Sequence, residues 1–253
     1  MHLSVFLKPS GKGKMSKREA AQALNDGHSI FVTDLRALGY TPEGILNWIV
    51  LMGWGVAEDD VMTLGEMIER FDPNHLTASP AAINFAKLDH FNGTHIRLME
   101  AEDLAARIKP FLVAAGFEVD DGRLLKIVPL IRERLVTLDD AVPFAGFFFA
   151  ADVEPAAADL VGKDLSPAQS AEVTQAAYEI LAALPELTHV AAEPPLRELV
   201  EQRGLQVNQV FGILRVAVTG QKVSPPLLES MEIIGRDKVL ERIRRAIETL
   251  KAM

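Results

Sequence analysis

The sequence has no cysteine, and this absence excludes disulfide bonds, thiolate zinc sites and cysteine nucleophiles. No apolar run reaches the roughly 18 residues of a membrane span, so we expect no membrane-spanning segment. The first residues also lack the long apolar stretch of a secretory signal peptide. Together these absences favour a cytoplasmic protein.

Several common catalytic arrangements are missing as well. The sequence contains neither H-E-x-x-H nor G-x-S-x-G, and His90 and His95 stand five residues apart instead of at the i, i+4 spacing of a helical metal pair. The acidic run at residues 58–60 and the pair Asp139 and Asp140 could be metal ligands, but they are more typical of a solvated turn and a first helical turn. We therefore expect no metal site.

The charge is negative overall but unevenly distributed. A net charge of −9 argues against a general nucleic-acid binder. Residues 1–20 and residues 236–251 nevertheless carry an excess of lysine and arginine. An acidic protein with basic stripes of this kind can still bind RNA locally.

The most informative segment is Lys14-Met15-Ser16-Lys17-Arg18, which follows a short apolar strand expected over residues 2–7 and a glycine-lysine loop. Lysines beside a glycine-hinged loop suit a polyphosphate, although a solvated charged face is the commoner meaning of such a run. The loop does not match G-x-x-x-x-G-K-[ST], which argues against a P-loop nucleotide hydrolase.

Apolar periodicity and helix caps predict a mainly α fold, with a short mixed α/β region followed by all-α helical domains. Thr41-Pro42 and Thr63 are expected to begin helices, and Asn84 is expected to begin another that exits at Gly93. Pro194-Pro195 is expected to open a later helix, and residues 150–165 are the best linker candidate.

Some candidate binding residues have two interpretations. Residues 147–149, three phenylalanines, could stack on bases but are more often core. Arg132 and Arg134 suit contacts to bases or phosphates, and they equally suit an exposed helix end. For Arg215, on a largely apolar helix, a buried ion pair and a nucleic-acid contact both remain open.

Four ordered segments resemble bacterial glutamyl-tRNA synthetase, a class I aminoacyl-tRNA synthetase, from its KMSK loop onward. The matching segments are Lys14-Met15-Ser16-Lys17-Arg18; Gly39-Tyr40-Thr41-Pro42-Glu43 with Asn47-Trp48; Phe85, Lys87-Leu88, Asn92-Gly93 and His95-Ile96; and Thr219-Gly220 with Ser224-Pro225-Pro226-Leu227. Their order and spacing hold across nearly the whole chain.

The resemblance implies three domains. Residues 1–98 are similar to the stem-contact region that holds the KMSK loop, and residues 99–157 and 158–253 are similar to two helical anticodon-binding domains. The implied partner is tRNA-Glu, and the full enzyme would ligate glutamate to this tRNA with ATP and Mg²⁺.

The resemblance also assigns roles to single residues. Lys14 and Lys17 would bind ATP phosphates while Ser16 supports the loop. Arg134 matches the arginine that meets the third anticodon base in members specific for tRNA-Glu. The anticodon pocket would include Arg215, Ser224, Pro225 and Leu227, with arginine and serine donating hydrogen bonds and the apolar residues packing on bases.

The sequence lacks the HIGH motif and the Rossmann domain that complete the ATP site of class I synthetases. We therefore expect an excised or split part of the enzyme, a monomer that binds no cofactor alone and is inactive without its catalytic domain as partner. One alternative is a free-standing helical interaction module that has lost tRNA. Another is part of a non-discriminating enzyme that also charges tRNA-Gln, against which Arg134 argues.

Overall fold

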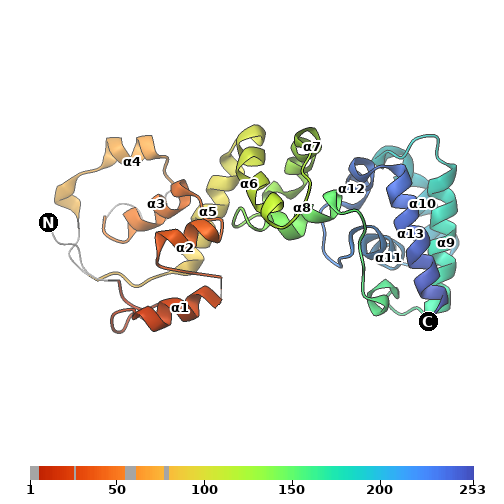
Figure 1. The fold of residues 1–253 in the computed structure, drawn as a ribbon, viewed down its shortest axis with the longest axis horizontal. Coiled ribbons are helices and arrows are strands. Elements are labelled where there is room, and N and C mark those ends of the chain that lie inside the picture. The colour runs from red at the N-terminus through yellow and green to blue at the C-terminus, as the bar shows by residue number, and fades with distance from the viewer. Residues whose placement is uncertain (1–5, 26, 55–60, 77–79) are drawn as a thin grey trace. The chain divides into compact units, whose positions relative to one another are not determined.

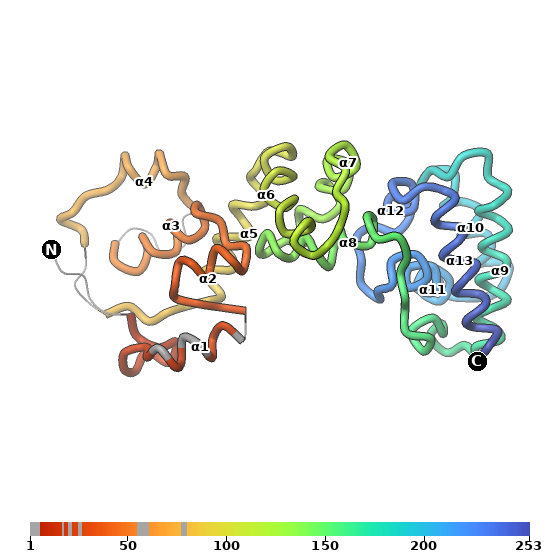
Figure 2. The backbone as a smooth tube through the Cα atoms, viewed as in Figure 1, coloured from red at the N-terminus to blue at the C-terminus, as the bar shows by residue number. Residues whose placement is uncertain are grey.

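A computed structural model describes residues 6–25, 27–54, 61–76 and 80–253. Over these ranges the chain is built from helices, with β pairing limited to isolated bridges (Figures 1 and 2). The helices are α1 (Lys17–Asn25), α2 (Val32–Ala37), α3 (Pro42–Leu51), α4 (Leu64–Arg70), η1 (Pro73–His75), α5 (Phe85–Leu98), α6 (Ala101–Ala114), α7 (Asp121–Ile131), η2 (Arg132–Arg134), α8 (Ala141–Phe149), η3 (Ala157–Leu160), α9 (Pro167–Ala183), α10 (His189–Gln202), α11 (Val207–Thr219), α12 (Leu227–Ile234) and α13 (Arg236–Lys251). The expected mainly α fold class is confirmed.

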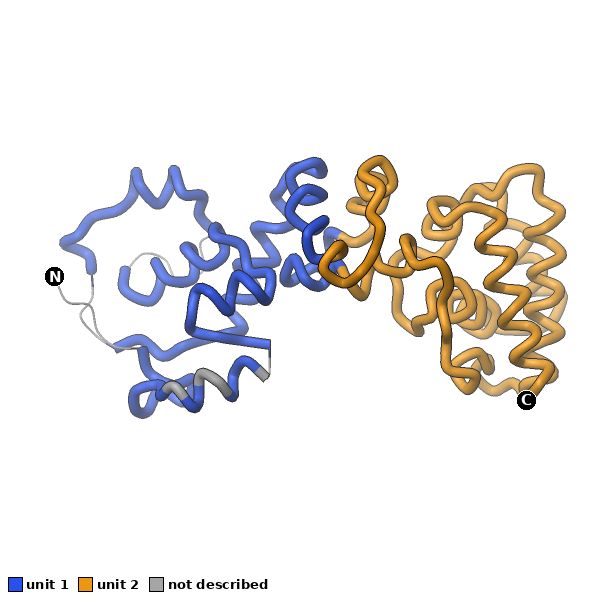
Figure 3. Tube along the Cα trace, viewed as in Figure 1, with its two compact units in different colours: residues 1–111, 132–141 blue, residues 112–131, 142–253 orange. Residues whose placement is uncertain are grey.

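The chain divides into two compact units (Figure 3). Unit 1 comprises residues 1–111 and 132–141, and unit 2 comprises residues 112–131 and 142–253. The division into residues 1–98, 99–157 and 158–253 stays a prediction.

In unit 1 the packing of α3 against α5 forms the centre. Thr41 caps α3 by accepting a hydrogen bond from Gly44 N at 3.1 Å, and Pro42 is the first helical residue, as the sequence predicts. The capping box at Thr63 is also present at the start of α4. Around α3 and α5 lie the buried side chains of Leu35, Tyr40, Ile45, Trp48, Leu88 and Phe91.

The expected exit of a helix at Gly93 is wrong, because α5 continues to Leu98. A Cβ at Gly93 would lie 3.3 Å from Leu135 O, closer than most such contacts. Glycine therefore serves here to let the turn after α7 approach the middle of a helix, and it does not end that helix.

The β part of the mixed region is small where the structure describes it. Most of the strand expected over residues 2–7 lies outside the described residues. Leu7 itself forms an antiparallel bridge with Lys14 and a parallel bridge with Ala82. These bridges connect the start of the lysine-rich segment to the residues just before α5.

In unit 2 the last helix, α13, packs along α9 and α11 (Figures 1 and 2). Val239, Ile243, Ile247 and Leu250, which follow one another at helical spacing, are buried, whereas Leu240, expected on the same face, is only half-buried. This helix therefore organises the core of unit 2.

The predicted start of a helix at Pro194-Pro195 is wrong. Helix α10 begins at His189, and Thr188 caps it by accepting a hydrogen bond from Ala191 N at 3.2 Å. The two prolines lie inside this helix, where a threonine cap outweighs the usual tendency of proline to mark the first turn.

Residues 150–165, the linker candidate, belong to unit 2 and pack against its helices. Leu160 is buried, and a Cβ at Gly162 would lie 2.9 Å from Ile213 Cδ1. Gln209 Nε2 donates to Lys163 O at 2.8 Å. This segment is therefore packed and hydrogen-bonded, although it contains only the short helix η3.

Candidate functional site

The lysine-rich segment folds back on itself before α1. Lys8 N donates to Gly13 O at 3.0 Å, and Gly11 N donates to Lys8 O at 2.8 Å. Gly11 and Gly13 have φ angles of 73° and 80°, which glycine adopts without strain. Lys14 follows this turn and is exposed to solvent.

Ser16 is fixed by the start of α1. Its Oγ accepts a hydrogen bond from Glu19 N at 3.3 Å, and Glu19 Oε2 accepts one from Ser16 N at 2.9 Å. Lys8 Nζ lies 2.6 Å from Glu19 Oε1. The hydrogen bond from Lys8, with those from Ser16, lowers the pKa of Glu19 to about 2. Lys17 is the first residue of α1, and its side chain lies outside what the structure describes.

A cavity of about 290 Å³ lies beside this segment, lined in part by Met15, Glu19, His28 and Phe85. The His28 ring stacks on Phe85 with centroids 4.6 Å apart, and His28 Nε2 lies 3.1 Å from Asp89 Oδ2. Buried Met15 covers one wall of the cavity, so the loop is seated on an apolar support.

Arg134 ends η2 and is exposed, in a turn of unit 1 that we call the Arg134 turn, residues 132–140. Asp140 Oδ2 accepts hydrogen bonds from Val136 N at 2.8 Å and Thr137 N at 2.7 Å. Val136 O in turn accepts one from Asn92 Nδ2 at 2.6 Å. Asp140 thus organises backbone, in agreement with the structural interpretation of the Asp139 and Asp140 pair.

Arg215 lies in unit 2 and holds the loop before α12. Its Nη1 donates to Ser224 Oγ at 2.5 Å, Ser224 O at 3.2 Å and Pro225 O at 3.0 Å. The structure therefore brings Arg215, Ser224 and Pro225 together, and Leu227 follows as the first residue of α12.

The side chains of this loop differ in exposure. Ser224, Pro225 and Leu227 are buried, whereas Pro226 is exposed and Val223 is 66% exposed. The buried members shape the loop, and its outer surface is formed by residues 222–223 and Pro226.

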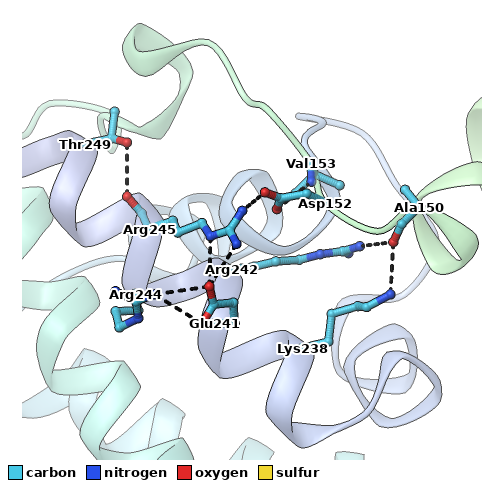
Figure 4. A network of polar contacts seen from close by, with 9 residues as sticks. All are labelled: Ala150, Asp152, Val153, Lys238, Glu241, Arg242, Arg244, Arg245 and Thr249. Carbon is cyan, nitrogen blue, oxygen red and sulfur yellow. Dashed lines mark hydrogen bonds and ion pairs between the residues drawn. The ribbon is translucent and has the colours of Figure 1, made fainter.

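The most buried cation of the described residues was not singled out by the sequence. Arg242, only 2% exposed, donates from Nη1 to Val218 O at 2.7 Å and from Nη2 to Phe147 O at 3.0 Å. Its Nη2 also donates to Ala150 O at 3.1 Å (Figure 4). Burial lowers its pKa to about 10, so it remains charged at neutral pH. The signal was its position between Val239 and Ile243 on the apolar face of α13.

Other cations of α13 also bind protein groups. Lys238 Nζ donates to Ala150 O at 3.0 Å, and Arg245 pairs with Asp152 (Figure 4). Arg236 donates to the carbonyls of Ala182 and Leu184 at the end of α9. The basic excess of residues 236–251 therefore serves the packing of unit 2 to a large extent.

The remaining candidates are mostly core. Phe147 is 5% exposed and Phe148 is fully buried, with ring centroids 4.2 Å apart.

Among the described residues no cluster of histidine, aspartate and glutamate could hold a metal ion. The acidic run at 58–60 lies outside those residues. No described helix combines the length and apolar character needed to cross a bilayer.

Comparisons with known proteins give two matches to family models. Residues 103–247 match the anticodon binding domain, and residues 1–90 match the catalytic domain of class I tRNA synthetases (E and Q). The first match includes Arg134, Arg215, Ser224, Pro225 and Leu227. The second includes Lys14, Ser16 and Lys17.

The similar proteins named below are all described as glutamate–tRNA ligases. The chain is 38% identical over 251 residues to a glutamate–tRNA ligase of Saccharopolyspora erythraea, covering 94% of this chain and 47% of that protein. It is 37% identical over 263 residues to one of Chloroflexus aurantiacus, covering 99% and 50%. A crystal structure of a glutamate–tRNA ligase of Elizabethkingia meningosepticum in complex with its amino acid matches with a TM-score of 0.82 and 30% identity, covering 98% of this chain and 51% of that chain. The chain thus spans about half the length of the relatives it matches.

Proposed function

This chain belongs to the glutamate–tRNA ligase family, and we propose that it is the part of such an enzyme that binds the stem and anticodon of tRNA-Glu. The observation that carries this proposal is the anticodon-binding match over residues 103–247, which covers more than half of the chain and all five anticodon candidates. The fold agrees with it, because the regular elements of that range are all helices.

Arg134 is proposed to contact the third anticodon base. It is exposed on a turn whose backbone is fixed, and a guanidinium can make a bidentate contact to a base edge. Glutamate and glutamine codons differ at their first base, so the third anticodon base is C in tRNA-Glu and G in tRNA-Gln. An arginine that donates to the O2 and N3 acceptors of an unpaired cytosine would meet the N1–H and N2–H donors of guanine at the same edge, so it would separate the two tRNAs.

Arg215 is proposed to support the anticodon pocket from within. Its hydrogen bonds to Ser224 and Pro225 fix the backbone of the loop, and its charge lies beside the surface that an RNA phosphate would approach. Because Ser224, Pro225 and Leu227 are buried in the described structure, direct packing on a base would fall first to exposed parts of this loop such as Pro226.

Ligation of glutamate is proposed only for the full enzyme, in which Lys14 and Lys17 would bind the phosphates of ATP with Mg²⁺. Exposed Lys14, near Ser16, whose Oγ accepts a hydrogen bond from Glu19 N, suits an incoming anion. We propose that this chain alone has no glutamate-dependent pyrophosphate exchange, and measurable exchange would contradict that statement. We further propose that it acts as a cytoplasmic monomer.

The test of tRNA binding is the affinity of the full chain for tRNA-Glu and for tRNA-Gln at one stated salt concentration. We expect tighter binding of tRNA-Glu, a loss of that preference in Arg134→Gln, and weaker binding in Arg215→Ala. Arg203→Gln, which removes an exposed arginine of unit 2, is the matched control and should keep the preference.

The alternatives give different results. A helical interaction module would bind neither tRNA specifically, and all variants would behave alike. A part of a non-discriminating enzyme would bind both tRNAs, with no preference for Arg134→Gln to remove.

A further inference from the structure

The Arg134 turn is attached to the rest of unit 1 by residues with no proposed contact to RNA. Asn92 Nδ2 in α5 donates to Val136 O at 2.6 Å, two residues beyond Arg134. From another side, Leu138 N donates to Gly39 O at 2.9 Å. Two separate segments of unit 1 therefore hold the backbone that carries Arg134.

Asn92 joins three elements through one fully buried amide. Its Oδ1 accepts hydrogen bonds from Thr41 N and Thr41 Oγ1, both at 2.8 Å, while its Nδ2 faces the turn. Thr41 is the cap of α3, so the same amide connects α3, α5 and the Arg134 turn. Only a side chain that both accepts and donates fulfils this task; alanine does neither.

The approach of the backbones is as close as glycine permits. A Cβ at Gly39, where φ is 85°, would lie 2.5 Å from Asp139 N. A Cβ at Gly93 would lie 3.3 Å from Leu135 O. The turn thus has little freedom to move relative to α5 or to the loop before α3.

We propose that Asn92, with Gly39 and Gly93, positions Arg134, so that selectivity for the third anticodon base depends on a buried amide that does not touch the RNA. This inference rests on the proposed function. It gives a physical role to Gly39 and Asn92, which the sequence singled out only as parts of segments that resemble the family. A bidentate contact needs a donor pair at a fixed place, and a small displacement of the turn weakens it.

The experiment compares binding of the full chain to a tRNA-Glu transcript and to the same transcript with G in place of C at the third anticodon position. The ratio of the two affinities measures selectivity, and one good bidentate contact gives a ratio of roughly 5- to 150-fold. Arg134→Ala sets the lower limit of this ratio. We expect Asn92→Ala to bring the ratio close to that limit and so to lose most of the roughly 5- to 150-fold selectivity, with little change in affinity for the G-containing transcript.

A matched control separates positioning from stability. Asn47 is also a fully buried asparagine of unit 1, but its Oδ1 accepts hydrogen bonds from Met62 N at 2.8 Å and His95 Nε2 at 3.0 Å. Asn47→Ala should lower the melting temperature and keep the selectivity ratio. An equal loss of selectivity in Asn47→Ala and Asn92→Ala would overturn the proposal.

A second pair of variants covers the case in which Asn92→Ala does not fold. Asp140→Ala removes the acceptor of Val136 N and Thr137 N, whereas Asp140→Asn keeps an acceptor oxygen. We expect a lower selectivity ratio in the first variant and recovery in the second. Unchanged selectivity in Asp140→Ala and Asn92→Ala would contradict the inference alone, whereas no selectivity in the unmodified chain would overturn the proposed function and this inference together.

Discussion

The two units hold their irregular segments by different chemistry. In unit 1 the Arg134 turn is fastened by a neutral amide, Asn92, and by glycines that let backbones meet. In unit 2 the backbone around Ala150 is fastened by cations of α13, with Arg242 fully inside and Lys238 partly covered. Both arrangements satisfy carbonyls that lie outside a regular hydrogen-bond ladder.

The difference matters because a neutral amide and a guanidinium are buried at different energetic cost. An amide with all its partners is close to neutral in free energy, whereas a buried cation needs acceptors that offset its loss of hydration. Arg242 has three carbonyl acceptors, while its Nε has no hydrogen-bond partner among the described residues. The stability of unit 2 therefore depends on Arg242. Asn92 can position the Arg134 turn in unit 1 at a smaller cost to stability, since its loss leaves no uncompensated charge.

Replacement of Arg242 should give the largest effect on stability. Arg242→Ala removes three charge-assisted hydrogen bonds to Val218 O, Phe147 O and Ala150 O. At about 1.5 kcal/mol or more for each bond, we expect the free energy of unfolding of unit 2 to fall by about 4 kcal/mol. Urea denaturation measures this change.

The control for this prediction is Lys238→Met, which removes a cation of the same helix bound to the same carbonyl of Ala150. Lys238 is only partly buried and its pKa is lowered by burial and by nearby Arg242 and Arg123, so its loss should cost about 1 kcal/mol. Equal costs for both variants would show that burial of the guanidinium is not what distinguishes unit 2.

The next effect concerns the close approach of backbones in unit 1. Gly39 and Gly204 both have positive φ angles, 85° and 63°, but a Cβ at Gly204 would meet nothing within 4 Å. Gly204→Ala in unit 2 should cost about 1 kcal/mol for the left-handed conformation alone. Gly39→Ala should cost about 3 kcal/mol, because its Cβ also collides with Asp139 N.

Thermal unfolding of the two alanine variants checks this difference. Similar losses for Gly39→Ala and Gly204→Ala would mean that the Arg134 turn can move away from residue 39. That result would also weaken the positioning role assigned to Asn92.

Local signals of the sequence predicted the helical skeleton well. Thr41, Pro42 and the Thr63 capping box lie where a few neighbouring residues decide the conformation, and the structure has each of them as expected. The buried face of α13 was also predictable, because the helical spacing of its apolar residues indicates which side packs in the core.

Contacts between residues far apart in the sequence could not be predicted from such local patterns. Gly93 suggested a helix end because glycine usually breaks helices, but Leu135 O, far along the chain, sets the requirement for a small residue. Arg242 could not be singled out from its neighbours, because its carbonyl partners lie in segments 24 to 95 residues away. The same holds for Asn92: its segment resembles the family, but the sequence does not predict its hydrogen bond to Val136 O.

The smallest effect is a difference in the pH dependence of the two units. His95 in unit 1 is 6% exposed, and burial lowers its pKa from the ordinary value of 6.5, opposed by nearby Glu43. As the pH falls through about 6.5, the unfolded chain binds a proton at His95 that the folded unit binds less readily. Unit 1 should therefore lose stability between pH 7.5 and 5.5, by at most about 1.4 kcal/mol per pH unit.

Unit 2 should show the opposite sign. Glu232, through its hydrogen bond at 2.8 Å and its charge, raises the pKa of exposed His189, with Glu229 and Glu193 adding to the effect. Its stabilisation is complete below pH 6.5 and is lost as the pH rises through the higher folded pKa, while Arg242 stays charged throughout. His95→Gln keeps a donor for Asn47 and removes the titration, so it should flatten the pH dependence of unit 1 alone. If the stability of unit 1 still falls with pH in this variant, the acid sensitivity belongs to another group. The predicted difference in pH dependence between the two units would then not arise from His95.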